Sequence, residues 1–317
     1  MIAHGVRAPG DRKAAVFTFA HLSDPHLELP PVRPFELLSK RATGYASWRW
    51  RRRHIHAGEA LAASVRDLKA AAPRHVVVTG DLANISTRAE FAQARDWLHE
   101  LGDPADVSLV PGNHDAYVKT GWGDTLGLWA PFMAGDGAAV PTSREGFPYV
   151  RRRGPVAFVG LNTALARLPL FATGTLGPSQ IERFETIMRA LADEDVCRVV
   201  LIHHPPQEGG AGRHKGLTDS AAFRAAIGRV GADLVLHGHN HRLQLGAIGS
   251  PVGPVPVVGV ASTSAHPASK YGAGGYHLVS VQRDGAAWRF GIDVRRLRED
   301  LSGCDTGQTL NLLGPGA

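Results

Sequence analysis

The sequence is poor in the residues that build covalent cross-links or membrane spans. It contains only two cysteines, Cys197 and Cys304, in 317 residues. Two cysteines are too few for a disulfide framework, so a reducing compartment is expected. No apolar run approaches the roughly 20 residues that a membrane-spanning helix needs. Residues 1–15 are polar and lack the apolar core of a secretory signal. We therefore expect a cytoplasmic protein whose residues 1–15 form a disordered tail.

The net charge alone does not identify the class of binding partner. Lys and Arg number 35 against 29 Asp and Glu, a net charge of +6. This excess suits nucleic acid, phospholipid headgroups and phosphorylated metabolites equally. A hydrophobic fraction of 44% at this length is ample for a sizeable core. We expect one domain over residues 16–297, and a C-terminal tail over 298–317 because hydrophobic periodicity is missing there.

Two segments interrupt the pattern as insertions. The first, about residues 27–57, has no acidic residue between Glu36 and Glu59, and its cationic and tryptophan side chains include Trp48, Arg49, Trp50, Arg51, Arg52 and Arg53. Such a mixture suits the surface of an anionic membrane, a groove for phosphate or single-stranded nucleic acid, or a solvated face with locally packed rings. The second, about residues 116–147, is predicted to be a cap, lid or pocket wall.

One short polar stretch follows a predicted buried strand over residues 107–110. Pro111 and Gly112 break that strand, so Asn113, His114 and Asp115 lie on a turn at its C-terminal end. Ligands bind at this edge of open α/β sheets. An amide oxygen can bind a metal, an imidazole can transfer a proton, and a carboxylate can orient that imidazole. Taken alone, a polar turn that caps the strand explains the stretch equally well.

Polar residues follow four other predicted strands in the same way. They are Asp24 and His26 after 16–22, Asp81 and Asn84 after 75–79, His203 and His204 after 197–202, and His239 and His241 after 233–236. Residues two apart on an extended segment can face one point. Helices are predicted over 58–72, 178–192 and 219–230. The glycine-rich loop 209–216 carries Arg213 and Lys215, which either contact a substrate phosphate or are simply solvated.

Taken together, these motifs resemble those of the calcineurin-like metallophosphoesterase superfamily over roughly residues 16–294. They are Asp24-x-His26, Gly80-Asp81, Gly112-Asn113-His114-Asp115, His203 and Gly238-His239-x-His241. The His-His-Pro-Pro and Gly-Asp-Leu-Ala-Asn stretches are similar to its bacterial phosphodiesterase-type branch. The resemblance implies an α/β (α+β) fold, a four-layer αββα sandwich, with two divalent metal ions at the C-terminal edge of its sheets.

The resemblance also implies a role for each residue. Asp24, His26 and His241 would hold the first metal, Asn113, His203 and His239 the second, and Asp81 would bridge both. His203 is preferred to His204 because the family ligand lies two positions before a proline. His114 would protonate the leaving oxygen or stabilise its charge, and Asp115 would either orient His114 or stabilise the turn. The residues expected to contact substrate are Asn84, His204, Arg213 and Lys215.

The expected chemistry is hydrolysis of a phosphodiester or pyrophosphate bond by a metal-bridging hydroxide. Mixed His and carboxylate ligands suit Mn, Fe or Zn without choosing among them, and two such ions can share a hydroxide. One alternative resembles the UDP-2,3-diacylglucosamine pyrophosphatases, acting on a lipid-linked substrate at the inner membrane surface. Others are a cyclic-nucleotide phosphodiesterase, a phosphomonoesterase and a nuclease, although no dedicated nucleic-acid module is evident. A non-catalytic metal-binding scaffold is the alternative from another class.

Overall fold

The computed structural model describes residues 16–316 and contains two six-stranded mixed sheets. The predicted tail over residues 1–15 lies outside the described residues. The first sheet has the order β12-β11-β10-β1-β2-β3, formed by Cys304–Leu313, Ala287–Leu297, Gly275–Asp284, Phe17–Leu22, Val76–Val78 and Val107–Leu109. The second has the order β4-β5-β6-β7-β9-β8, formed by Tyr149–Arg153, Val156–Gly160, Cys197–Leu201, Leu234–His237, Gly253–Gly259 and Gln244–Ser250.

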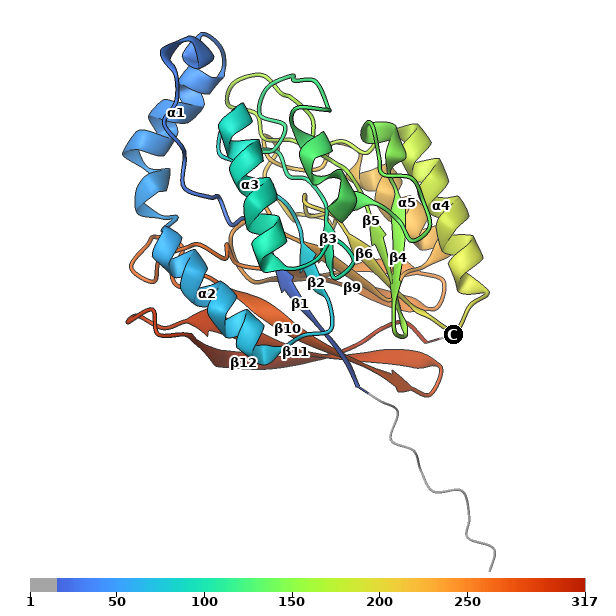
Figure 1. The fold of residues 1–317 in the computed structure, drawn as a ribbon. Helices are drawn as coiled ribbons and strands as arrows, with labels where there is room; N and C mark the ends of the chain where they lie inside the picture. Colours follow the sequence, from blue (N-terminus) through green and yellow to red (C-terminus); the bar gives the residue numbers. More distant parts are fainter. Residues whose placement is uncertain (1–15, 317) are drawn as a thin grey trace, which may run out of the picture.

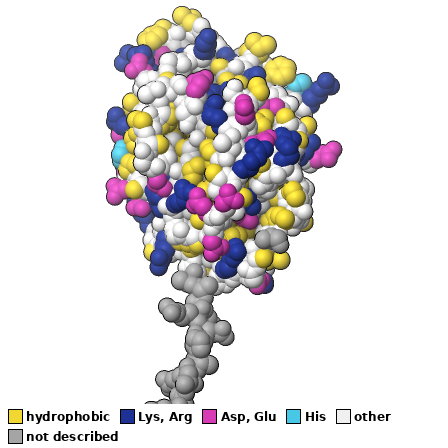
Figure 2. Space-filling view, turned by 90° about the vertical axis from the view of Figure 1, so that its right-hand side faces the viewer, with side chains coloured by type: hydrophobic (Ala, Val, Ile, Leu, Met, Phe, Trp, Pro, Cys, Tyr) yellow, Lys and Arg dark blue, Asp and Glu magenta, His cyan; other side chains and the backbone are white. Residues whose placement is uncertain are grey.

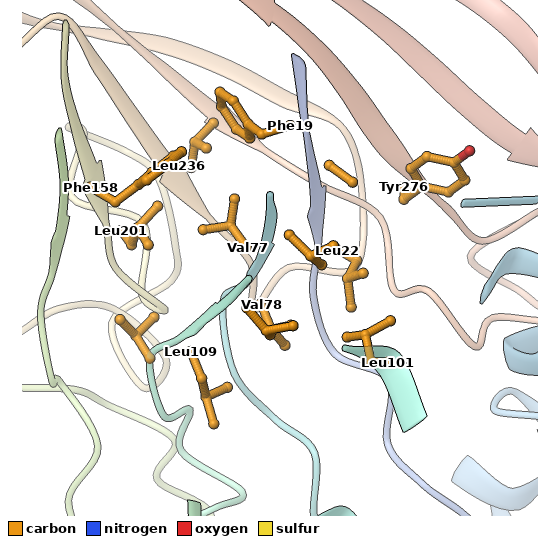
Figure 3. Packing of buried hydrophobic residues seen from close by; sticks show 14 of the residues in the cluster. Phe19, Leu22, Val77, Val78, Leu101, Leu109, Phe158, Leu201, Leu236 and Tyr276 are labelled. Carbon is orange, nitrogen blue, oxygen red and sulfur yellow. The ribbon is translucent and has the colours of Figure 1, made fainter. Parts of the chain in front are cut away.

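Helices cover the outer faces of both sheets, as Figure 1 shows. Helices α2 (Gly58–Ala71) and α3 (Arg88–Leu101) pack on the first sheet, and α4 (Pro178–Ala192) and α5 (Ser220–Val230) pack on the second. Between the sheets, the ring of Phe19 on β1 meets that of Phe158 on β5 edge to face, with centroids 5.1 Å apart. Figure 3 shows Leu201 and Leu236 in the same layer. The predicted four-layer αββα sandwich is therefore confirmed.

Parallel pairing brings the strand ends to one edge. Strands β1, β2 and β3 are parallel to one another, with Leu22, Val78 and Leu109 side by side. In the other sheet, β6 is parallel to β7. The loops that leave these five strands therefore meet at the carboxyl edge of the sandwich, where open α/β sheets bind ligands.

A buried capping box fixes the loop after β2. The Thr87 hydroxyl accepts a bond from the Glu90 amide, and the Glu90 carboxylate accepts one from the Thr87 amide. The same carboxylate also accepts bonds from the amides of Asn84 and Ile85. The turn between β2 and α3 is thus held from the first turn of the helix.

The predicted C-terminal tail is wrong for residues 304–313, which form β12. This strand pairs with β11 along its length, yet most of its side chains are exposed. An edge strand of this kind is stabilised by its backbone ladder more than by buried side chains. It therefore carries little of the hydrophobic alternation that a sequence pattern detects.

The predicted lid over residues 116–147 is wrong for its central part. The 3-10 helix η3 (Leu126–Met133) buries Trp129, Phe132 and Met133 completely in the main core. The Trp129 indole also donates to the carbonyl of Phe91 on α3, at 2.9 Å. Removing these side chains from the core would expose much apolar surface, so this part of the insertion is a fixed element of the fold.

The first insertion folds as a helical hairpin that projects at the upper left of Figure 1. It comprises the 3-10 helix η1 (Pro34–Leu37), α1 (Arg41–Trp50) and the 3-10 helix η2 (Arg52–His54). Another short 3-10 helix, η4 (Arg144–Gly146), precedes β4. Within residues 16–316, no helix is both long and apolar enough to cross a bilayer. Figure 2 shows cationic and anionic side chains interspersed on the side that carries α4.

Candidate metal site at the sheet edges

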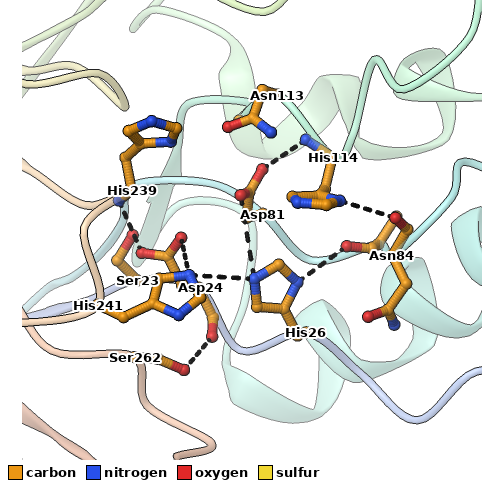
Figure 4. Close-up of polar contacts among 12 residues, drawn as sticks. Ser23, Asp24, His26, Asp81, Asn84, Asn113, His114, His239, His241 and Ser262 are labelled. Carbon is orange, nitrogen blue, oxygen red and sulfur yellow. Dashed lines mark hydrogen bonds and ion pairs between the residues drawn. The ribbon is translucent and has the colours of Figure 1, made fainter. Parts of the chain in front are cut away.

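All seven predicted metal ligands lie on the loops that leave these five strands, and Figure 4 labels all of them except His203. Asp24 and His26 follow β1, Asp81 follows β2 and Asn113 follows β3. From the other sheet, His203 follows β6, and His239 and His241 follow β7. The edges of both sheets therefore contribute to one cluster.

The first group joins Asp24, His26 and His241. The Nε2 atoms of His26 and His241 are 3.3 Å apart, and His241 Nε2 is 3.3 Å from Asp24 Oδ1. Two imidazole nitrogen atoms at this distance from each other, with a carboxylate oxygen beside them, form a compact set of donors for a cation. Burial lowers the pKa of His26 well below its ordinary value, so its imidazole is neutral, the form that binds a metal.

The second group joins Asn113, His203 and His239. His203 Nε2 lies 3.2 Å from Asn113 Oδ1, and the rings of His203 and His239 are 5.1 Å apart. Asp81 Oδ2 lies 3.4 Å from His203 Nε2 and 4.0 Å from His26 Nε2. This one carboxylate therefore reaches both groups, as expected for a bridging ligand.

Electrostatics keeps the Asp81 carboxylate charged. Burial alone would raise the pKa of Asp81, but His203 and His114 outweigh it and hold the pKa well below its ordinary value. Burial alone would lower the pKa of His203, but the negative charge of Asp81 outweighs the effect of burial and raises this pKa to about 9. In the absence of a metal, a proton on His203 thus balances the buried carboxylate, and a bound cation would take over this role.

Backbone strain concentrates on the same residues. Of the nine non-glycine residues with positive φ in the described part of the chain, five are predicted ligands: Asp24, His26, Asp81, His239 and His241. Left-handed backbone at such residues is costly and clusters at functional sites. Gly112 and Gly238 make room for this packing, since a Cβ on Gly238 would lie 2.6 Å from Asp24 Oδ2 and one on Gly112 would lie 2.6 Å from the Asp81 amide nitrogen.

An unpartnered nitrogen atom in the cluster supports a fit to metals. Within residues 16–316, His239 Nε2 is buried and makes no hydrogen bond. Buried polar atoms without partners are rare in folded proteins and call for an explanation such as an ion. Ligation would satisfy atoms of this kind, and the mixture of imidazole, carboxylate and amide donors suits first-row divalent metals.

His114 lies beside the cluster in an orientation set by its neighbours. Its backbone amide donates to Asp81 Oδ1 at 2.7 Å, and its Nδ1 is 2.7 Å from the carbonyl oxygen of Asn84. Its ring is parallel to that of Tyr117, with centroids 5.6 Å apart. Burial and the adjacent Arg52 lower the pKa of His114 to about 4.

Among the hydrogen bonds of the described residues, none joins the Asp115 carboxylate to the His114 imidazole, which favours the predicted alternative of a turn-stabilising carboxylate. Its carboxylate accepts four backbone N–H bonds of 2.8 to 2.9 Å, from Asp81, Leu82, Ala83 and Gly112. Burial and the Asp81 carboxylate raise the pKa of Asp115 to about 7, and the N–H groups oppose this rise. Asp115 therefore ties the loop after β2 to the loop after β3.

Two predicted substrate contacts have structural partners instead. The Asn84 side chain donates to the carbonyl of Leu27 at 2.7 Å, and only its backbone oxygen faces His114. His204 is fully buried, with Nδ1 2.7 Å from the Thr163 hydroxyl and Nε2 3.1 Å from the carbonyl of Ala172. Since both ring nitrogens of His204 have protein partners, the geometry favours His203 as the ligand.

The loop residues Arg213 and Lys215 are exposed. Among the hydrogen bonds and ion pairs of the described residues, none joins either side chain to the metal cluster. Their contact with substrate stays a prediction.

The basic insertion contributes two residues whose place in the site the sequence does not reveal. Arg52 turns inward, with Nη1 3.0 Å from His114 Nδ1 and Nη2 donating to the carbonyl of Gly44 at 3.0 Å. Its predicted membrane contact is therefore wrong. His56 lies against His26, with ring centroids 4.4 Å apart. Neither residue belongs to a motif, and only their place in a folded hairpin brings them to the site.

A cavity of about 570 Å³ reaches the Tyr117 ring, which lies parallel to that of His114. It is lined by Tyr117, by the loop residues Leu168, Pro169 and Phe171, and by three cationic side chains, Lys40, Lys119 and Arg167. Lys40 Nζ lies 4.1 Å from the centre of the Tyr117 ring. The cavity thus combines an aromatic wall, an apolar wall and positive charge, and Tyr117 is the lining residue that contacts the candidate catalytic imidazole.

Comparison with known proteins agrees with this geometry. The family model for calcineurin-like phosphoesterases matches residues 17–243. A probable cyclic nucleotide phosphodiesterase from Synechococcus is 27% identical over 184 residues, which span 57% of this chain and 63% of that relative.

Two solved structures share the fold. A dimetal phosphatase from Danio rerio has a TM-score of 0.58 at 13% identity, with 93% of this chain and 98% of that chain covered. A purple acid phosphatase from yellow lupin seeds has a TM-score of 0.56 at 14% identity, with 94% of this chain and 54% of that chain covered. The family match over most of the chain, with the ligand groups in place, establishes that the chain belongs to the calcineurin-like phosphoesterases.

Proposed function

We propose that the protein is a dinuclear-metal hydrolase of phosphodiesters or pyrophosphates. The observation that carries this proposal is the position of Asp81 Oδ2, within 4.0 Å of a nitrogen ligand from each of the two groups. Asp24, His26 and His241 would hold one ion, and Asn113, His203 and His239 the other. Two divalent ions, when bound, supply an activated water and neutralise charge on the phosphoryl oxygens.

His114 and Arg52 are placed to act on the leaving group. The contact between His114 Nδ1 and the Asn84 carbonyl leaves Nε2 for the oxygen that departs. A phosphoryl group beside the ring would oppose the lowering of the His114 pKa and so favour a proton on the imidazole. Arg52 Nη1 lies 3.0 Å from the same Nδ1 and 3.4 Å from Nε2, and it adds positive charge beside the ring where negative charge develops.

The cavity lined by Tyr117 supports a substrate with an organic group on each side of phosphorus. Its volume of about 570 Å³ accommodates a sizeable leaving group. Tyr117 and Phe171 offer aromatic surface, and Lys40, Lys119 and Arg167 offer charge for a further phosphate. The Synechococcus relative, named as a cyclic nucleotide phosphodiesterase, is consistent with a diester substrate.

The test compares a diester and a monoester on the Mn²⁺-reconstituted protein. We expect turnover of bis-p-nitrophenyl phosphate, and its loss in Asn113→Ala and His203→Ala. Hydrolysis of p-nitrophenyl phosphate alone would replace this proposal with a phosphomonoesterase. No turnover of either ester by a metal-loaded protein would favour the scaffold alternative.

Exposed apolar side chains on the hairpin support a second candidate, a lipid-linked substrate at a membrane surface. Phe35, Leu38 and Trp50 are 63%, 87% and 74% exposed, and the neighbouring Arg49, Arg51 and Arg53 are also exposed. Rings and cations together suit an anionic membrane interface. Replacement of the three arginines by Ser should then weaken binding to phosphatidylglycerol vesicles, and unchanged binding would remove this candidate.

A further inference from the structure

The hairpin reaches the metal cluster through His56 as well as Arg52. The backbone around His56 is fixed on both sides: the Ala57 amide donates to the carbonyl of Ser264 at 3.0 Å, and the Ile55 carbonyl accepts from the His266 amide at 2.8 Å. His56 itself forms a β-bridge with Ala265. The imidazole is therefore held by the loop after β9, and its position does not depend on the exposed end of the hairpin.

The hydrogen bonds of His56 define which ring nitrogen carries the proton. Its Nδ1 lies 2.8 Å from Ser264 Oγ and 3.2 Å from Ser262 Oγ. Ser262 Oγ already donates its proton to the carbonyl of Asp24, at 2.7 Å (Figure 4). Toward His56 the Ser262 hydroxyl can therefore only accept, so a hydrogen bond between His56 and Ser262 requires the proton on Nδ1, and this tautomer has a lone pair on Nε2.

The His56 ring lies against two residues of the first group of ligands, with its centroid 4.4 Å from that of His26 and 5.3 Å from that of His241. His56 Nε2 is buried and, in the described part of the chain, has no hydrogen-bond partner. One ligand atom from each of His26, His56 and His241 can be chosen so that all lie within 4.8 Å of one another. Metal-binding histidines commonly show this arrangement, with one nitrogen free for the ion and the other donating to a fixed acceptor.

We propose that His56 is an additional ligand of the first metal, supplied by the basic hairpin. This inference rests on the proposed function, since it adds a ligand to that same centre. A neutral imidazole would raise the nitrogen donors of the first group from two to three without adding charge. It would also link the hairpin that carries Arg52 to the occupancy of the metal site.

The test is calorimetric titration of metal-free full-length protein with Mn²⁺, for the wild type, His56→Ala and His54→Ala. His54 lies two residues earlier in the same segment and is exposed, so it is the matched control. We expect His56→Ala to weaken one of two binding events by roughly 10–100-fold, and His54→Ala to bind as the wild type does. The Co²⁺ visible spectrum of His56→Ala should also change, because one nitrogen ligand is lost.

The outcomes separate this inference from the proposed function. His56→Ala could instead show two binding events of wild-type affinity and an unchanged Co²⁺ spectrum. This result would overturn the proposal that His56 is a metal ligand and would leave the proposed function intact. Absence of metal binding by the wild type would overturn both proposals. If His56→Ala is misfolded by circular dichroism, His56→Gln, which retains bulk and polarity, should give the same loss of affinity.

Discussion

Arg52 belongs to a basic segment that is expected at the surface, yet its side chain contacts His114 in the candidate site. The guanidinium of Arg52 is packed between the imidazole of His114 and the carbonyls of Gly44 and Asn84. Its neighbours Arg51 and Arg53 are exposed. Three arginines in succession thus have different surroundings, because the 3-10 helix after α1 turns only one of them inward.

Loss of Arg52 should therefore impair catalysis where loss of Arg53 does not. We expect Arg52→Ala to lower kcat for a diester by roughly 10–100-fold, because His114 loses its partner and the leaving oxygen loses nearby charge. Steady-state kinetics with Arg53→Ala as control measures the difference. Equal kcat in the two variants would show that Arg52 serves the fold alone.

The loss of activity on replacement of His114 should depend on the leaving group. We expect His114→Ala to reduce hydrolysis of an alkyl diester by about 10²–10⁴-fold, the usual range for a general acid. The loss should be smaller for a nitrophenyl diester, since nitrophenolate departs without a proton. Equal losses for both esters, at full metal content, would contradict a role in protonation.

At the scale of elements, Asp67 on α2 links that helix to the C-terminal strands. Its carboxylate accepts from the Tyr276 hydroxyl at 2.7 Å, from Arg295 at 2.8 Å and from the Cys304 amide at 2.9 Å. Burial raises the pKa of Asp67, but these donors outweigh it, and the pKa lies below its ordinary value of 3.8. One helix, β10, β11 and β12 thus meet at a single side chain.

Asp67→Asn should destabilise the fold in a pH-dependent way. Because the folded-state pKa is depressed, the stabilisation is complete above the ordinary value of 3.8 and is lost as the pH falls through the folded-state pKa. We expect a loss of about 1–3 kcal/mol at pH 7, shrinking below about pH 4, in urea unfolding. The control Asp305→Asn, an exposed partner of Arg298, should cost at most about 1 kcal/mol. A difference that stays constant with pH would contradict this account.

The elements differ in how far the sequence predicts them. Helix α4 has the predicted bounds, 178 to 192, because Pro178 begins it and apolar residues recur on one face. Strand β12 escapes prediction because an exposed edge strand shows little alternation. In the site, the sequence predicts the ligands that follow buried strands, because the end of a buried strand is visible in a sequence. The structure brings these ligands together. Arg52, His56 and the partners of Asp115 depend on contacts between distant loops, and no local pattern records such contacts.

At the scale of the whole molecule, the metal site joins the two halves of the sandwich. Loops from both sheets place carboxylates, imidazoles and strained backbone in one buried cluster. Without cations, this arrangement carries unpartnered nitrogen atoms and close, buried charges. Metal binding should therefore stabilise the entire fold and not only one loop.

Removal of the metals should lower the thermal stability. An ion present at 100 times its Kd contributes about 2.7 kcal/mol, so we expect the melting temperature to fall by several degrees on chelation and to recover when Mn²⁺ is restored. Differential scanning calorimetry with and without Mn²⁺ makes the comparison. A melting temperature that does not respond to chelation would argue against metals at this buried cluster.

The most direct test of the central claim is the activity of metal-free protein as Mn²⁺ is added in known amounts. A dinuclear centre bridged by Asp81 predicts that hydrolysis of bis-p-nitrophenyl phosphate rises with added metal and saturates at two ions per chain. It also predicts that Asp81→Ala stays inactive at any ratio. Full activity at one ion per chain, or full activity of the metal-free protein, would contradict the account.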